Sequence, residues 1–348
     1  MAKFTNEAAA ALVFGIVYLI MWLYMAYMYA TKQYRWNSRW SVLFFHATLR
    51  VASQACGVAF GILAWSNVDV FVAYLILGAE GYFSLTIASY YFLHHYLLKH
   101  FGSSRLIPFD LETMPKAQRR TRVLMLIGMV PVVMPWKFWH NDLMAIVDSW
   151  LIPANAIIIA GGSIMAGGMD PKSSRYDGMS PEEIQKKMDD TLFISKALRT
   201  TGQAVFLALT VVFGVFILHT LRRGQRHGGI TWTILIFVFV ALMMLVRGLF
   251  GVLQAGIYSL SYYNPENYNS HGMTGRFTAL EYCLAVLPEF TAALALNISW
   301  RTTITEAPLK EHGVKDTEDG HVLHATRTDD ESRAGDAELK PELLPEVK

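Results

Sequence analysis

The chain has 348 residues, of which 53% are hydrophobic and only 17% are charged. The formal net charge of +2 argues neither for nor against nucleic acid, but the lack of a basic domain or aromatic stacking platform excludes a nucleic-acid-binding protein. Two cysteines, both inside predicted spans, indicate no disulfide framework. This composition is typical of membrane proteins, and the sequence predicts an all-α, polytopic transmembrane helix bundle.

The first hundred residues predict three membrane spans joined by loops of different charge. The apolar runs 8–30, 41–65 and 70–98 can each cross a hydrocarbon core of about 30 Å at about 1.5 Å per residue. The loops after the first and third runs are rich in Lys and Arg, whereas the loop between the second and third runs has neither. Basic loops face the cytoplasm in most membrane proteins, so we expect these two loops to be cytoplasmic.

The next region allows two topologies. The run 123–139 is short and contains Pro131 and Pro135, so we interpret it as an interfacial or re-entrant segment. The run 143–167 is long enough to be the fourth span. If 123–139 also crossed the membrane, the chain would have eight spans. A larger share of the Lys and Arg residues would then lie in cytoplasmic loops than in the seven-span topology. We prefer seven spans because the disputed run is short and broken by prolines.

The second half of the chain predicts three further spans and a tail. A polar segment before residue 200 has Ser180 as an N-cap followed by Pro181, which predicts a short surface helix. Spans five, six and seven follow at 200–220, 231–257 and 277–300. Span six has a single arginine, Arg247, in an almost unbroken apolar run. Residues 1–301 therefore form the transmembrane domain. Residues 302–348 are highly charged, so we expect a disordered cytoplasmic tail.

Polar side chains inside the predicted spans are the candidate functional residues, because burying them in a bilayer is costly and they usually face the interior of the bundle. Helical spacing places each set on one face of its span. These candidates are His46, Arg50 and Gln54 in span two, Glu80 in span three, Arg247 and Gln254 in span six, and Glu281 and Glu289 in span seven.

Estimated depths predict how these charges pair. Arg50 is expected to meet Glu80 or Glu289 near the midplane, and Arg247 to meet Glu281 nearer the outer face. One interpretation is structural: buried ion pairs fix the helix register. The other is functional: the polar residues line a cavity that holds a lipid-like or small amphipathic ligand, or supply a carboxylic acid that protonates one.

Short motifs carry a resemblance to known proteins. Thr48-Leu49-Arg50 lies in span two, Gly161-Gly162 ends span four, and Val246-Arg247 and Pro288-Glu289 lie in the last two spans. In this layout, residues 8–300 resemble the fungal seven-span membrane proteins grouped only as a domain of unknown function. They are loosely similar to the fungal lipid-translocating exporters tied to toxicant resistance. The segment 101–142 departs from that layout, and the resemblance supplies no catalytic residues.

Two function classes follow. The first is a multi-pass protein of the plasma membrane or an endomembrane that binds or transports a lipophilic small molecule, as a receptor or an exporter. The alternative is an integral-membrane enzyme of fungal secondary metabolism, such as a cyclase with a buried carboxylic acid as proton donor. Membrane lipid is the expected partner, and no cofactor is indicated. No metal site is predicted, because the histidines that end span three lack further intramembrane ligands.

Overall fold

A computed structural model shows the arrangement of the spans. It describes residues 4–36, 38–107, 124–125, 129–138, 142–168, 178–226, 229–270 and 272–306. Within these residues, seven helices are long and apolar enough to cross a membrane. This confirms the predicted all-α, seven-span bundle. The predicted tail, 302–348, lies outside the described residues beyond Glu306, and its first residues continue the last helix to Thr305.

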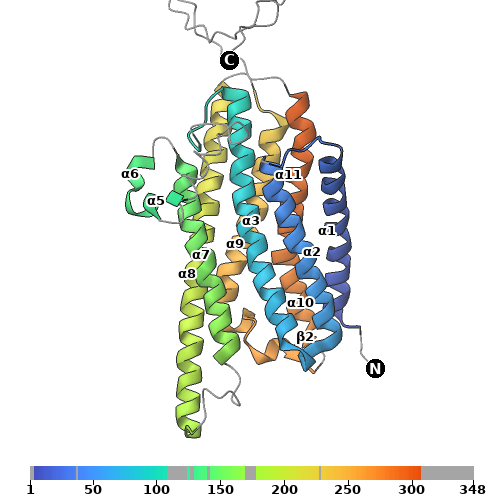
Figure 1. The fold of residues 1–348 in the computed structure, drawn as a ribbon, viewed down its shortest axis with the longest axis vertical. Coiled ribbons are helices and arrows are strands. Elements are labelled where there is room, and N and C mark those ends of the chain that lie inside the picture. The colour runs from blue at the N-terminus through green and yellow to red at the C-terminus, as the bar shows by residue number, and fades with distance from the viewer. Residues whose placement is uncertain are drawn as a thin grey trace, which may run out of the picture. The chain divides into compact units, whose positions relative to one another are not determined.

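The spans alternate in direction through the bundle (Figure 1). They are α1 (Asn6–Ala30), α2 (Arg39–Leu63), α3 (Val68–Phe101), α7 (Leu143–Gly168), α8 (Pro181–Arg226), α9 (Trp232–Gly256), and a last rod made of α10 (Gly275–Glu281), a π-helical turn (Tyr282–Val286) and α11 (Leu287–Thr305). Helices that follow one another in the chain pack side by side, and α11 returns to pack on α9. The central helix is α3, which contacts α2, α7, α8, α9 and α11.

The outer surface of the bundle is apolar, which is the reverse of a soluble protein. Large aliphatic side chains are exposed along α1, α8 and α9, among them Val13, Val215 and Leu242. Charged side chains such as Arg50, Arg247 and Glu289 are buried instead. An apolar exterior this extensive requires hydrocarbon around it, so the burial pattern supports a membrane-spanning bundle independently of hydropathy.

The two ends of the bundle differ in character. At the basic end, α3 and α8 finish and α9 begins, and α8 finishes with Arg222, Arg223 and Arg226. At the opposite end, called here the tyrosine-rich end, the segment 257–274 folds over the helices. It contains 3₁₀ turns at Tyr258–Leu260 and Pro265–Asn267 and a two-stranded antiparallel hairpin, β1 (Tyr268–Asn269) with β2 (Gly272–Met273). Trp65 Nε1 donates a hydrogen bond to the Asn269 carbonyl at 3.2 Å, which ties this segment to the 3₁₀ turn Ala64–Ser66 that follows α2.

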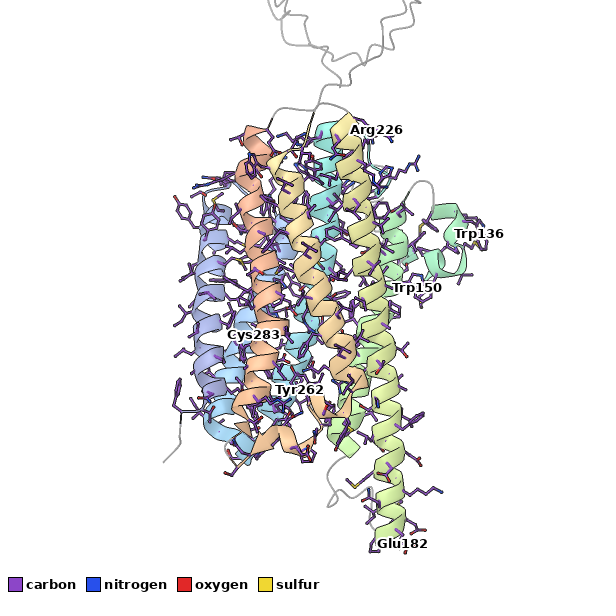
Figure 2. The ribbon with its side chains drawn as sticks, turned by 180° about the vertical axis from the view of Figure 1, so that it is seen from behind. Trp136, Trp150, Glu182, Arg226, Tyr262 and Cys283 are labelled. Atoms are coloured by element: carbon purple, nitrogen blue, oxygen red, sulfur yellow. The ribbon has the colours of Figure 1, made fainter. Side chains whose placement is uncertain are left out.

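The ambiguous run 123–139 does not form a span in its described part. It forms two single-turn helices, α5 (Val130–Val133) and α6 (Pro135–Phe138), beside α7 (Figure 1). Proline begins α6 and lies within α5, and it cannot donate the backbone hydrogen bond that a longer helix needs. Figure 2 shows Trp136 projecting away from the bundle, and this side chain is 66% exposed. An exposed tryptophan suits the membrane interface, as predicted for this segment.

One predicted boundary is wrong. The sequence predicts a short surface helix separated from the fifth span, but α8 is one continuous helix from Pro181 to Arg226. Ser180 and Glu183 do form the expected cap, with Glu183 N donating to Ser180 Oγ at 3.3 Å and Ser180 N donating to Glu183 Oε2 at 2.9 Å. No proline or glycine interrupts the polar residues that follow before Gly202, so nothing ends the helix.

Small residues let α7 and α8 approach closely. A Cβ atom on Gly202 would lie 2.7 Å from the Ala154 carbonyl oxygen, and Ser195 Oγ donates a hydrogen bond to the Gly161 carbonyl at 2.7 Å. Close backbone approach through glycine and serine is a principal source of helix association in membranes.

This contact predicts an asymmetry between two glycines of the same helix. Gly202→Ala should lower the unfolding temperature of the detergent-solubilised protein by several degrees, because overpacking costs about 1–3 kcal/mol. Gly214→Ala is the matched control, since a Cβ there meets no atom within 4 Å. Intrinsic tryptophan fluorescence during heating measures both variants, and equal unfolding temperatures would contradict the packing argument.

Candidate functional site

The centre of the bundle holds one carboxylate between two arginines. Glu289 of α11 forms an ion pair with Arg50 of α2 through its Oε2, and Arg247 of α9 donates from Nε to its Oε1 at 2.5 Å. The three residues are 1%, 3% and 6% exposed. Charges this deeply buried are tolerated only when they are paired, so Glu289 connects three helices that are distant in the sequence.

Arg50 packs against a glycine of α3. A Cβ on Gly81 would collide with the Arg50 guanidinium, whereas a Cβ on Gly78 would lie 3.9 Å from its Nη1, an ordinary van der Waals distance. The glycine that follows Glu80 therefore leaves the space that the arginine occupies. Glu80 itself faces α7, where Asn155 Nδ2 donates to its Oε1 at 2.6 Å.

The predicted pairings are half right. Arg50 does pair with Glu289, one of its two predicted partners. Arg247 also pairs with Glu289, so its predicted pairing with Glu281 is wrong. Glu281 accepts a hydrogen bond from Gln254 Nε2 at 2.7 Å instead. The antiparallel α9 and last rod thus meet at two levels, Arg247 with Glu289 and Gln254 with Glu281.

A π-helical turn explains this register. Glu281 and Glu289 are eight residues apart, which would separate them by about 80° on a regular α-helix. The turn Tyr282–Val286 lies between them, and a π-turn absorbs about one extra residue, which reduces the separation to about 20°. Both carboxylates therefore face α9. Pro288 follows the turn and lacks an N–H donor, so it favours such a departure from the α-helical ladder.

His46 and Gln54, also predicted for the site, have structural partners. His46 Nδ1 lies 2.9 Å from the Gly81 carbonyl oxygen and 3.2 Å from Ser84 Oγ, which joins α2 to α3. Gln54 Oε1 accepts a hydrogen bond from Tyr282 OH at 3.2 Å, which joins α2 to the last rod.

A cavity of about 540 Å³ opens beside the charged centre, toward the tyrosine-rich end. Of the predicted residues, Arg50, Arg247, Gln254 and Glu281 line it, whereas His46, Gln54, Glu80 and Glu289 do not. The α3 and α7 sides are apolar, with Leu75, Ile76, Ala79, Ile158, Ile159 and Met165. This volume and mixture of walls are typical of small-molecule sites in proteins.

Sequence reasoning missed several lining residues. Arg199 and Gln203 are four residues apart on α8 and face the cavity together, but Arg199 belongs to the polar segment that the sequence places before the fifth span. Their shared helical face was the available signal. Tyr262, Tyr263 and Tyr268 come from the segment 257–274, and Figure 2 shows Tyr262 at that end of the bundle.

These loop tyrosines keep their phenolic protons. Burial raises the pKa of Tyr262 well above its ordinary value, and the nearby Glu281 carboxylate raises it further. Burial likewise raises the pKa values of Tyr263 and Tyr268. All three remain neutral at physiological pH, so they can donate hydrogen bonds as well as pack against an apolar body.

Comparison with protein-family models, with curated proteins and with solved structures finds no match to this chain. In the part of the chain that the structure describes, no group of three or more His, Cys, Asp or Glu side chains could hold a metal ion.

The shared carboxylate predicts a large difference between two glutamates. Glu289→Gln leaves two buried guanidiniums without a counter-charge, so it should destabilise the protein by about 3 kcal/mol or more. Glu80→Gln is the control, because a glutamine oxygen can still accept from Asn155, and its effect should be below about 1 kcal/mol. The unfolding temperatures of the two variants in detergent, each compared with that of the unchanged protein, measure this difference.

A triple replacement separates the charge effect from packing. Changing Arg50→Met, Arg247→Met and Glu289→Leu together removes every charge of the centre, so stability should recover most of what Glu289→Gln loses. If Glu289→Gln lowered the stability no more than Glu80→Gln does, the ion pairs of Glu289 with Arg50 and Arg247 would not be what holds the bundle together.

Proposed function

We propose that this protein binds a lipophilic small molecule inside its helix bundle, as a receptor or an exporter of such compounds. The observation that carries the proposal is the 540 Å³ cavity between α3, α7, α8 and α9, with apolar side chains on one side and arginines on the other. A molecule with an apolar body and a polar group fits both sides.

The location of the cavity suits a ligand that comes from the membrane or from the non-cytoplasmic side. The basic residues favour a cytoplasmic location for the basic end, so the tyrosine-rich end faces the exterior or an organelle lumen. The cavity lies toward this second end, where Trp65, Tyr262 and Tyr268 form part of its wall.

The charged centre favours binding over the alternative of proton-donating catalysis. Glu289 carries two arginine partners, and Glu281, the carboxyl that lines the cavity, accepts from Gln254. A general acid needs a route to the substrate, whereas Glu289 is engaged by two guanidiniums and does not line the cavity.

The proposal predicts where a lipophilic probe binds. A long-chain alcohol carrying a diazirine, added to the protein in nanodiscs and activated by light, should label α3 between Phe71 and Ala79 and α7 between Ile158 and Met165, in a saturable way. Mass spectrometry of the labelled peptides locates the sites.

A cavity-filling variant tests whether this labelling comes from the cavity. Gly162→Leu adds a side chain beside Tyr263, since a Cβ on Gly162 would lie 3.7 Å from Tyr263 OH. It should reduce the labelling several-fold. Gly214→Leu, where a Cβ meets no atom within 4 Å, should not. Non-saturable labelling confined to exposed positions such as Val211 and Val215 would refute the proposal.

A further inference from the structure

Arginines outnumber carboxylates among the residues that line the cavity. Arg50, Arg199 and Arg247 line it, together with the single carboxylate Glu281. One carboxylate that does not line it, Glu289, serves both Arg50 and Arg247. The remaining arginine, Arg199, forms no ion pair with any described residue, and its guanidinium stacks on Tyr263 at 4.9 Å from the ring centre. Among the lining residues, three guanidiniums therefore accompany one carboxylate in a low-dielectric setting, and Arg199 is the guanidinium that an anion can reach without displacing Glu289.

Buried hydrogen-bonding atoms beside the cavity also lack partners. Arg247 is 6% exposed, and neither its Nη1 nor Gln203 Oε1 has a hydrogen-bond partner among the described residues. Both atoms converge above Gly251, since a Cβ there would lie 3.1 Å from Arg247 Nη1 and 2.5 Å from Gln203 Oε1. An unpaired buried guanidinium N–H is costly, and rotation of the Gln203 amide turns its NH₂ group toward the same point, so an acceptor supplied by a ligand satisfies both side chains.

The donors extend from this depth to the mouth of the cavity. Arg199 precedes Gln203 by one turn of α8, about 6 Å nearer the tyrosine-rich end. Tyr262, Tyr263 and Tyr268 surround this level, and their phenols are protonated. Guanidinium and phenol groups are the donors that proteins use for carboxylate and phosphate oxygens. The opposite wall, on α3 and α7, offers only aliphatic contacts to the rest of the ligand.

We infer that the cavity selects an anionic amphiphile: a carboxylate or phosphate-monoester head held by Arg247 and Arg199, with its hydrocarbon body along Leu75, Ile76 and Ile158. This inference rests on the proposed function and adds the sign of the charge of the ligand. A cationic amphiphile would face excess arginines, and a neutral one would leave the unpartnered donors without a full acceptor.

Chain-matched competitors test the inference. Tetradecanoate, tetradecyl phosphate, tetradecanol and tetradecylamine compete with the photoreactive alcohol for the full-length protein in nanodiscs of zwitterionic lipid. At least one of the two anions should displace the probe at a concentration about ten-fold lower than the alcohol, because charge-assisted hydrogen bonds are roughly twice as strong as neutral ones. The amine should be the weakest competitor. A stronger carboxylate indicates a fatty-acid-like ligand, and a stronger phosphate indicates a phosphorylated lipid.

Variants of Arg199 test whether this residue causes the preference for an anionic competitor over tetradecanol, and they leave the buried charges of Arg50, Arg247 and Glu289 unchanged. Arg199→Gln should reduce the preference for the anion several-fold, and Arg199→Lys should retain most of it. Arg223→Gln is the matched control, because Arg223 stacks on Phe101 at the basic end, 4.4 Å from the ring centre. Its preference should equal that of the unchanged protein.

The possible results separate the two proposals. If tetradecanol competes as well as both anions, or the amine competes best, the inference of an anionic ligand fails while binding of a lipophilic molecule stands. If Arg199→Gln and Arg223→Gln change the preference equally, the inference fails as well. If no competitor displaces the probe and its labelling stays on outward-facing positions, the proposed function itself fails.

Discussion

The bundle depends on one carboxylate shared by two guanidiniums in a region without water. Lipid surrounds the helices, so the charges of Arg50, Arg247 and Glu289 cannot be solvated from outside and must satisfy one another. Because these residues come from α2, α9 and α11, the arrangement fixes the relative height of three helices. One carboxylate thus serves two guanidiniums, and both arginines also line the cavity.

The helix irregularities serve the same arrangement. The π-helical turn Tyr282–Val286 aligns Glu281 with Glu289, so that α9 meets both carboxylates from one face. Gly81 gives Arg50 a place against the α3 backbone, where any side chain would push the guanidinium aside. Neither feature is favourable for an isolated helix. Both become favourable once a charged group must be placed at a defined depth.

Much of this architecture could be predicted from residue patterns. Each span is a long apolar run, and the exposed face of α1 shows why: side chains such as Val13 and Ile16 face lipid and must be apolar. The polar stripe of α2 is also readable, since His46, Arg50 and Gln54 recur at helical spacing and all are buried. These predictions succeed because they depend only on local periodicity and on the cost of placing polar groups in hydrocarbon.

Predictions that depend on contacts between helices fare worse. Depth estimates place Arg247 near Glu281, but its partner is Glu289. A long arginine side chain reaches across more than one helical turn, and the π-helical turn shifts the register of the last rod. The sequence predicts the start of the fifth span at residue 200, although no residue just before it breaks a helix, so it does not predict the continuity of α8. Arg199, which faces the cavity, therefore falls outside the predicted span, and Gln203, although inside that span, is not among the predicted site residues.

The cavity itself follows from how these helices pack. Glycines at positions 161 and 202 bring α7 and α8 into backbone contact, whereas the side chains of Arg247 and Arg50 occupy the space between α9, α2 and α3. Tight packing on one side and bulky charged groups on the other leave a space that neither set can fill. The segment 257–274 covers this space with tyrosines rather than with aliphatic side chains, so the cover is polar enough to contact a headgroup and apolar enough to pack against the bundle. Binding capacity is thus a consequence of the same buried charges that fix the fold.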